Sequence, residues 1–261
     1  MRYLRVLGVF YKAAILTDLE YRANLVTNVL MSSVAALATV LTIGVFFGHT
    51  DNIGGWSFYE TLVVVGLFQL FLGMVDTFIT PNVGDFTEHL RTGTLDFILT
   101  KPLNSQFHAS LRRINIWRAI DTLIGAGVIA YALAHLNVTL TVERGLIFGV
   151  LLVCAAIILY ALIMLLITSA FWFVQLENVM ELLFTFYETG RFPVSVFPAW
   201  LRAILTFIVP IAFITTIPAA AIIGRLNLEF VLLAVIVAAV LLAACMAFWR
   251  FAVRHYSSAS S

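Results

Sequence analysis

The chain alternates long stretches without charge with short polar segments. No charged residue lies between Arg22 and Asp51, between Arg144 and Glu177, or between Glu229 and Arg250. A helix rises 1.5 Å per residue, so about 20 residues cross the roughly 30 Å apolar core of a bilayer. These three stretches therefore predict membrane-spanning helices at residues 23–48, 145–173 and 229–250.

Two further apolar stretches each contain one acidic residue. Residues 58–83 include Asp76 and residues 114–136 include Asp121, and both stretches are long enough to span. The region 177–224 combines three glutamates with four prolines. Hydropathy favours a span at 203–224, but spans and re-entrant pieces cannot be separated here by hydropathy alone.

The first 22 residues predict a helix that lies along the membrane surface. At 100° per residue its charged positions Arg2, Arg5, Lys12 and Glu20 fall within about 80°, and mostly apolar residues fill the opposite side. Cytoplasmic loops of membrane proteins are rich in lysine and arginine. With the N-terminus inside, eleven of the fifteen such residues lie there: residues 2, 5, 12, 22, 91, 101, 112, 113, 118, 250 and 254. Both termini are therefore expected in the cytoplasm.

Composition excludes several classes of protein. Hydrophobic residues make up 62% and charged residues 11%, against about 45–50% and 25% in soluble domains, which excludes a water-soluble fold. The net charge of +1 provides no field that would attract nucleic acid. Neither Lys12 nor Lys101 follows a glycine as a nucleotide-binding P-loop requires, and the histidines and cysteines lack metal-ligand spacing. We expect this chain to bind no cofactor.

The longest polar segment, residues 85–113, is the main candidate for an interaction surface. Gly93 can provide a turn between two short helical pieces, and Pro102 stops the second. Leu95, Phe97 and Leu99 leave apolar side chains among the charges. These side chains suit either the groove of a partner protein or contact with lipid headgroups, and the pattern alone does not decide between them.

A family resemblance rests on this segment and on a second one. The string from Arg91 to Leu103, RTGTLDFILTKPL, resembles the coupling loop of type-2 ABC transporter permeases, in which Gly-x-Leu-Asp-x-x-Leu-x-x-Pro precedes the third span. The string from Gly190 to Arg202, GRFPVSVFPAWLR, followed by Pro210 and Pro218, is similar to their segment between spans five and six. Residues 105–113 most resemble a poorly characterised multidrug-type branch.

The resemblance implies a fold and a set of partners. It implies an all-α integral membrane protein with six spans, a cytoplasmic coupling helix, a fifth span at 176–190, a re-entrant hairpin at 194–224 and a sixth span at 229–250. Such a permease in the bacterial cytoplasmic membrane exports a hydrophobic or amphipathic substrate with a separate ATPase that binds ATP and magnesium, and with an identical or different second permease. The residues expected to contact the ATPase are Glu88, Arg91, Gly93, Leu95, Asp96, Phe97, Leu99, Lys101 and Pro102.

Charged residues inside the predicted spans are candidates for the transport path. Glu177, Glu181 and Glu188 fall within about 40° on a helix, with Arg191 close enough to pair with Glu188. Because an acid at mid-membrane is costly, this stripe is expected to face a water-filled path, although an interfacial helix with a solvated face would show the same pattern.

Asp76 and Asp121 favour local pairing, with Arg118 three residues before Asp121, over contact with substrate. The two aspartates and the glutamate stripe, taken as ion sites, also support a rival hypothesis, a self-sufficient secondary transporter or channel. An intramembrane lipid enzyme is disfavoured because no arranged nucleophile and base were found. Small residues at four-residue spacing predict close helix packing, within one subunit or between two, at Ala126, Ala130, Ala134, Ala239, Ala243 and Ala247.

Overall fold

The structure is a computed structural model that describes residues 8, 10–12, 14–16, 22–96, 100, 104–136, 138–139, 141–172 and 176–256. The long helices are α2 (Arg22–Phe47), α3 (Phe58–Phe78), α4 (Thr80–Arg91), α7 (Ala119–His135), α8 (Val142–Ser169), α9 (Leu176–Glu188) and α12 (Leu228–His255). The short α-helices are α6 (Ser105–Leu111), α10 (Ala199–Ala203) and α11 (Thr216–Ile222). One-turn pieces are η1 (Ile116–Arg118), η2 (Thr189–Arg191), η3 (Val194–Val196), η4 (Ile204–Ile208) and η5 (Ile211–Phe213).

Five helices of the described residues are long and apolar enough to cross a membrane. They are Val26–Phe47, Phe58–Phe78, Ile116–His135, Val142–Ser169 and Leu228–His255. A sixth is obtained only if the pair 199–208 and 211–222, bent by 72°, is counted as one span. The predicted fold class, an all-α integral membrane protein, is confirmed.

The predicted fifth span, 176–190, differs from the other spans. It corresponds to α9 and the start of η2, and α9 has 13 residues. At 1.5 Å per residue this helix is about 20 Å long, about two-thirds of the thickness of a bilayer core. The α-helix ends because the chain tightens into η2 and then extends at Phe192 before Pro193. The described part of this helix is thus shorter than a bilayer core, and the fifth span stays a prediction.

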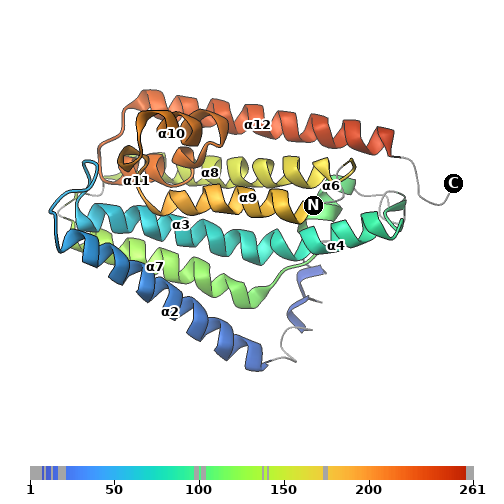
Figure 1. The fold of residues 1–261 in the computed structure, drawn as a ribbon, viewed down its shortest axis with the longest axis horizontal. Helices are drawn as coiled ribbons and strands as arrows, with labels where there is room; N and C mark the ends of the chain where they lie inside the picture. Colours follow the sequence, from blue (N-terminus) through green and yellow to red (C-terminus); the bar gives the residue numbers. More distant parts are fainter. Residues whose placement is uncertain are drawn as a thin grey trace.

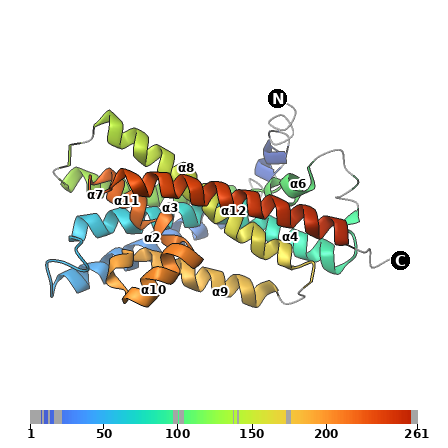
Figure 2. The same cartoon turned by 90° about the horizontal axis from the view of Figure 1, so that it is seen from above.

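The long helices lie side by side with two distinct ends (Figures 1 and 2). The end that carries α4, α6 and the last turns of α12 is called the α4 end below. The opposite end, which carries α10, α11 and the loop 48–57, is called the hairpin end. The predicted interfacial helix, 1–22, lies largely outside the described residues. Its described residues 8, 10–12 and 14–16 are helical, and the Phe10 ring lies 5.8 Å from that of His108, which places it at the α4 end.

Helices α3 and α7 pack with their backbones in contact through glycines. A Cβ added at Gly66 would lie 2.6 Å from Ile129 Cγ1, and one at Gly73 or Gly125 would collide with the backbone of the facing helix. Such close approach between membrane helices is what small residues allow. The predicted alanine seams do not serve this contact, because Ala126, Ala130, Ala134, Ala239, Ala243 and Ala247 are exposed on this chain. The described residues therefore leave much of the surface of these alanines uncovered.

Residues 195–225 fold back to the end at which they begin. Ser195 Oγ donates to Gly54 O at 2.6 Å, and Arg225 Nη1 donates to Gly55 O at 2.7 Å, so both ends of the segment are bound to one turn. Arg225 Nη2 also lies 2.7 Å from the Oε1 atom of the buried Glu60. This geometry agrees with a re-entrant hairpin and not with a span at 203–224.

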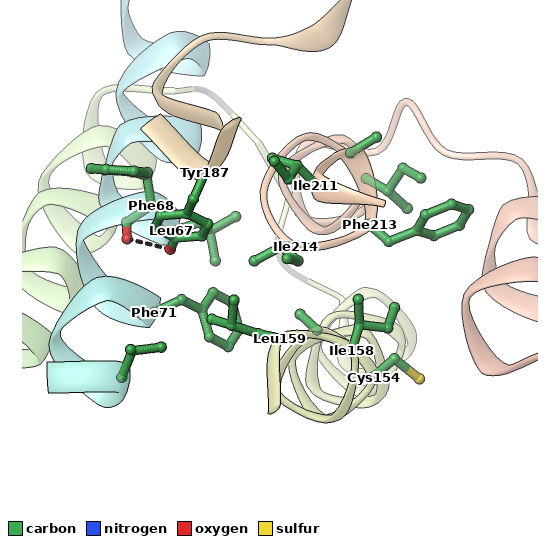
Figure 3. Close-up of a cluster of buried hydrophobic side chains, with 14 of the residues drawn as sticks. Leu67, Phe68, Phe71, Cys154, Ile158, Leu159, Tyr187, Ile211, Phe213 and Ile214 are labelled. Atoms are coloured by element: carbon green, nitrogen blue, oxygen red, sulfur yellow. Dashed lines mark hydrogen bonds between the residues drawn. The ribbon is translucent and has the colours of Figure 1, made fainter. Parts of the chain in front are cut away.

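The middle of the hairpin enters the core of the bundle. Figure 3 shows Ile211, Phe213 and Ile214 packed with α3 and α8 side chains and with Tyr187 from α9. Tyr187 donates its hydroxyl to Phe68 O at 2.9 Å. A phenol buried among apolar side chains needs such a partner, so this bond fixes the end of α9 against α3. The hairpin thus completes the core that α3, α8 and α9 leave open.

Candidate functional site

The predicted interaction segment begins as a helix that projects from the bundle. Helix α4 follows α3 with only Ile79 between them, and Ile79 itself has helical backbone angles. The predicted span 58–83 therefore ends early, at Phe78, and the polar segment continues the same direction as α4 (Figure 1). Pro81 lies in the first turn of α4, where a missing N–H is tolerated, and it accounts for the break.

The predicted turn at Gly93 is present and has a defined geometry. Gly93 has φ +69°, a conformation that only glycine adopts readily. Thr94 N donates to His89 O at 3.0 Å and Gly93 N to Leu90 O at 3.4 Å, the bond pattern of a Schellman motif. His89 Nδ1 lies 2.8 Å from Thr94 Oγ1, which fastens the turn further. The tip of α4 is therefore a fixed structure.

The tip presents charge on its outer side. Glu88 and Arg91 form an ion pair of 2.8 Å, and both side chains are more than half exposed. Phe97, Leu99, Lys101 and Pro102 lie outside the described residues, so their predicted roles stay predictions.

Leu95 requires a correction. It is fully buried and belongs to the hydrophobic core of this chain, so its side chain does not offer an apolar surface to a partner. The next residue, Asp96, lies near the end of α12. Burial and the neighbouring Asp96 carboxylate raise the pKa of the Tyr256 phenol above its ordinary value.

Helix α4 is clamped to the segment before α7. Asn82, which is buried, donates from Nδ2 to Arg113 O and accepts at Oδ1 from Arg113 N, both at 2.8 Å. Asp85 pairs with Arg113 Nε at 2.7 Å. On the other side, the Phe86 ring lies 5.4 Å from that of Trp249 on α12. A force on α4 would therefore reach both α7 and α12.

Helix α6 carries polar side chains whose partners the sequence did not indicate. Gln106 Nε2 lies 3.2 Å from Cys245 Sγ, and Ser110 Oγ lies 3.2 Å from the hydroxyl of Tyr160. Trp249 Nε1 donates to Ser105 Oγ at 3.0 Å. These contacts join α6 to α8 and α12. The alternation of polar and apolar residues in SQFHASL indicated polar side chains to satisfy. A local pattern could not identify their partners, because these lie too far away along the chain.

The glutamate stripe lies on the exposed side of α9. Glu181 is exposed, and Glu188 pairs with Arg191 at 3.2 Å as predicted. The side chain of Glu177 lies outside the described part of the structure. The Arg191 guanidinium also lies 4.9 Å above the Phe68 ring, which holds it against α3.

A groove of about 590 Å³ runs between α2, α3 and α7 and contains the two predicted intramembrane aspartates. Arg118 Nη1 lies 3.9 Å from both Asp76 and Asp121, which confirms the predicted local pairing. Gln69 Nε2 donates to Asp121 Oδ1 at 2.9 Å. Arg191 lines the groove as well. No cluster of three metal-ligating side chains occurs in the described ranges.

Comparison with known proteins identifies the kind of chain that carries these features. Residues 33–260 match the family described as ABC-2 family transporter protein. No significant match was found among curated proteins or among solved structures.

Proposed function

Because the chain belongs to the ABC-2 family of transporter proteins, we propose that it is the permease subunit of an ABC exporter of hydrophobic or amphipathic molecules. A separate ATPase binds ATP and magnesium and engages the tip of α4, and a second permease, identical or different, completes the path. The chain itself carries out no hydrolysis. The observation that carries the proposal is the projecting α4, capped at Gly93 and clamped to α7 and α12.

The proposed orientation places the α4 end and both termini in the cytoplasm of a bacterium. Four arginines then lie toward the outer face, against the usual charge bias. Each of them has a partner: Arg144 donates to Thr139 O, Arg191 to Glu188, Arg202 to Ser195 O and Arg225 to Glu60 and Gly55 O. Arginines whose charged groups are bound by residues of this chain act as structural residues, which supports the orientation set by the other eleven.

The proposed mechanism is transmission of movement. ATP binding brings two ATPase subunits together, and the docked α4 tips move with them. The bonds from Asn82 and Asp85 to Arg113 carry the movement to α7, and Phe86 carries it to Trp249 on α12. The nucleotide thereby favours one of two arrangements of the helices without contacting the substrate.

The proposed translocation path includes the stripe of Glu177, Glu181 and Glu188. Support comes from the exposure of Glu181 and Glu188 on this chain, because a charge at membrane depth is stable only beside water or a partner. The second permease would supply the facing wall. Glu181→Gln should then change the substrate range of the complex while leaving its assembly intact.

The docking assignment is tested by a charge swap at the tip of α4. Purified complexes with Glu88→Lys, Arg91→Glu or both changes would be assayed for permease-stimulated ATP hydrolysis. If the two residues contact the ATPase, the double swap stays defective, because it restores their own ion pair but presents reversed charges to the partner. Recovery in the double swap would show a purely local role and contradict docking there. Glu143→Lys, an exposed change at the hairpin end, is the matched control.

A second candidate function is a self-sufficient secondary transporter, favoured by the carboxylates in the groove. It predicts uptake into vesicles that contain only this chain when an ion gradient is imposed. The ABC proposal predicts no such uptake and requires the ATPase and ATP.

A further inference from the structure

The groove between α2, α3 and α7 has an excess of negative charge at the end where Asp76 and Asp121 lie. One guanidinium, that of Arg118, serves both carboxylates, and its distance of 3.9 Å from each exceeds that of a hydrogen bond. Among the described residues, Asp76, Asp121 and Arg118 thus leave one negative charge without a counter-charge. The other arginine of the groove, Arg191, pairs with Glu188, so it does not supply that charge.

One carboxylate oxygen in this groove has no hydrogen-bond partner in the described part of the chain. Asp121 is 5% exposed, and its Oδ1 accepts from Gln69, but its buried Oδ2 atom accepts no hydrogen bond from the described residues and has only the distant contact of 3.9 Å with Arg118 Nη1. Buried charged oxygens normally accept a hydrogen bond, and one that accepts none in a membrane protein indicates a ligand, a partner or water. Asp76 receives one bond from Thr80 at 3.1 Å and is a quarter exposed.

The rest of the groove is suited to an apolar body. Leu72, Ile43, Met31 and Phe192 form much of its wall, with hydroxyl groups of α2 between them. Helix α2 is itself mostly exposed, so a molecule can reach the groove sideways from the bilayer. The volume of about 590 Å³ lies in the range of sites for drug-sized molecules. The shape and charge together fit an amphiphile with one cationic group.

We infer that this groove binds lipophilic cations, with the positive group beside Asp121 and Asp76 and the apolar body against α2. This inference rests on the proposed function, since it names the substrate class of the permease. Arg118 is a positioning residue: it holds the two carboxylates on the same side of the groove and limits the affinity for a cation. The counter-charge that the groove lacks is supplied by the bound molecule.

The test compares two probes of the same shape and opposite charge. Tetraphenylphosphonium is a lipophilic cation, and tetraphenylborate is its anionic counterpart. Their binding to the full-length chain in phosphatidylcholine nanodiscs would be measured by equilibrium dialysis, without any ATPase. We expect saturable binding of tetraphenylphosphonium and only partition of tetraphenylborate into lipid. Equal saturable binding of the two probes would overturn the inference.

Variants locate the site. Asp121→Asn should weaken tetraphenylphosphonium binding at least about tenfold, because one charge-assisted contact is lost. Asp76→Asn, at a more exposed position, should weaken tetraphenylphosphonium binding several-fold. This variant tests the site if Asp121→Asn does not fold. Arg118→Gln should tighten binding, a change that misfolding cannot produce. Unchanged binding in Asp76→Asn together with no gain in Arg118→Gln would overturn the inference.

The controls separate this inference from the proposed function. Glu229→Gln, at an exposed position in the first turn of α12, should leave cation binding unchanged, and a loss equal to that of Asp76→Asn would overturn the assignment to the groove. ATP-driven export of neutral amphiphiles without any cation binding would refute the binding of cations in the groove and leave the proposed function standing. Cation binding that persists although no ATPase associates with the chain would support the groove and refute the ABC proposal.

Discussion

The clamp between α4 and Arg113 gives the sharpest local prediction. Asn82→Ala removes three hydrogen bonds of 2.8 Å: from Nδ2 to Phe78 O, from Nδ2 to Arg113 O, and from Arg113 N to Oδ1. At about 1 kcal/mol each, the local loss is about 3 kcal/mol. This free energy corresponds to an approximately hundredfold rise in the population in which Arg113 N–H is open. The spans do not depend on these bonds, so the bundle should stay folded.

Hydrogen exchange measures this change directly. The amide of Arg113 should exchange about a hundredfold faster in Asn82→Ala. Asn82→Asp should show a smaller effect, because its carboxylate still accepts from Arg113 N while both donated bonds are lost. Asn52→Ala removes a side-chain bond of 2.7 Å to Gly55 N at the hairpin end and should leave Arg113 exchange unchanged. Unaltered exchange at Arg113 in a folded Asn82→Ala protein would refute the clamp.

Three further predictions concern other parts of the chain. Gly73→Val should lower stability in detergent by about 3 kcal/mol, because its side chain meets backbone of α7, whereas Gly127→Val, which faces open space, should have little effect on the melting temperature. Arg225→Ala should cost about 1–3 kcal/mol by leaving the buried Glu60 carboxylate with one fewer partner, and faster proteolysis of the hairpin end would report it. Ala199→Cys should react with a membrane-impermeant thiol reagent in intact cells, and lack of labelling there would contradict the proposed orientation.

Much of the bundle follows from the arrangement of apolar stretches. Helices α2, α8 and α12 begin and end within a few residues of the predicted limits, with one exception. The agreement arises because a bilayer requires an apolar helix of fixed length. The C-terminal end of α12 is the exception: the helix continues to His255, past the predicted limit at 250. Hydropathy locates the end of the apolar stretch. Helix α12 continues beyond it, past Trp249, whose ring packs against that of Phe86.

The region 176–225 could not be derived from hydropathy. Its residues are apolar enough for a span, and what distinguishes a hairpin is the binding of both its ends to Gly54 and Gly55. Those contacts join residues more than 140 positions apart. The family resemblance supplied the hairpin where local pattern did not, and the fifth span that it also implied stays a prediction.

The sequence indicated some of the residues of the groove but not their arrangement. Ionisable residues within spans pointed to Asp76 and Asp121, and the spacing of Arg118 pointed to pairing. Two features depend on the packing of α3 against α7: one guanidinium is shared by two carboxylates, and Asp121 Oδ2 accepts no hydrogen bond in the described part of the chain. Likewise, Leu95 looked like an exposed contact because an apolar residue beside charges gives no sign in the sequence that it belongs to the core.

Site-specific cross-linking from the α4 tip tests the central claim most directly. A photoreactive benzoylphenylalanine would replace Thr92, an exposed residue of the tip, in a complex purified with its ATPase. The account predicts a covalent product between residue 92 and the ATPase, and none when the same group replaces the exposed Asn52 at the hairpin end. A complex that still couples ATP hydrolysis to transport but gives no ATPase product from residue 92, or gives it from residue 52, would contradict the account.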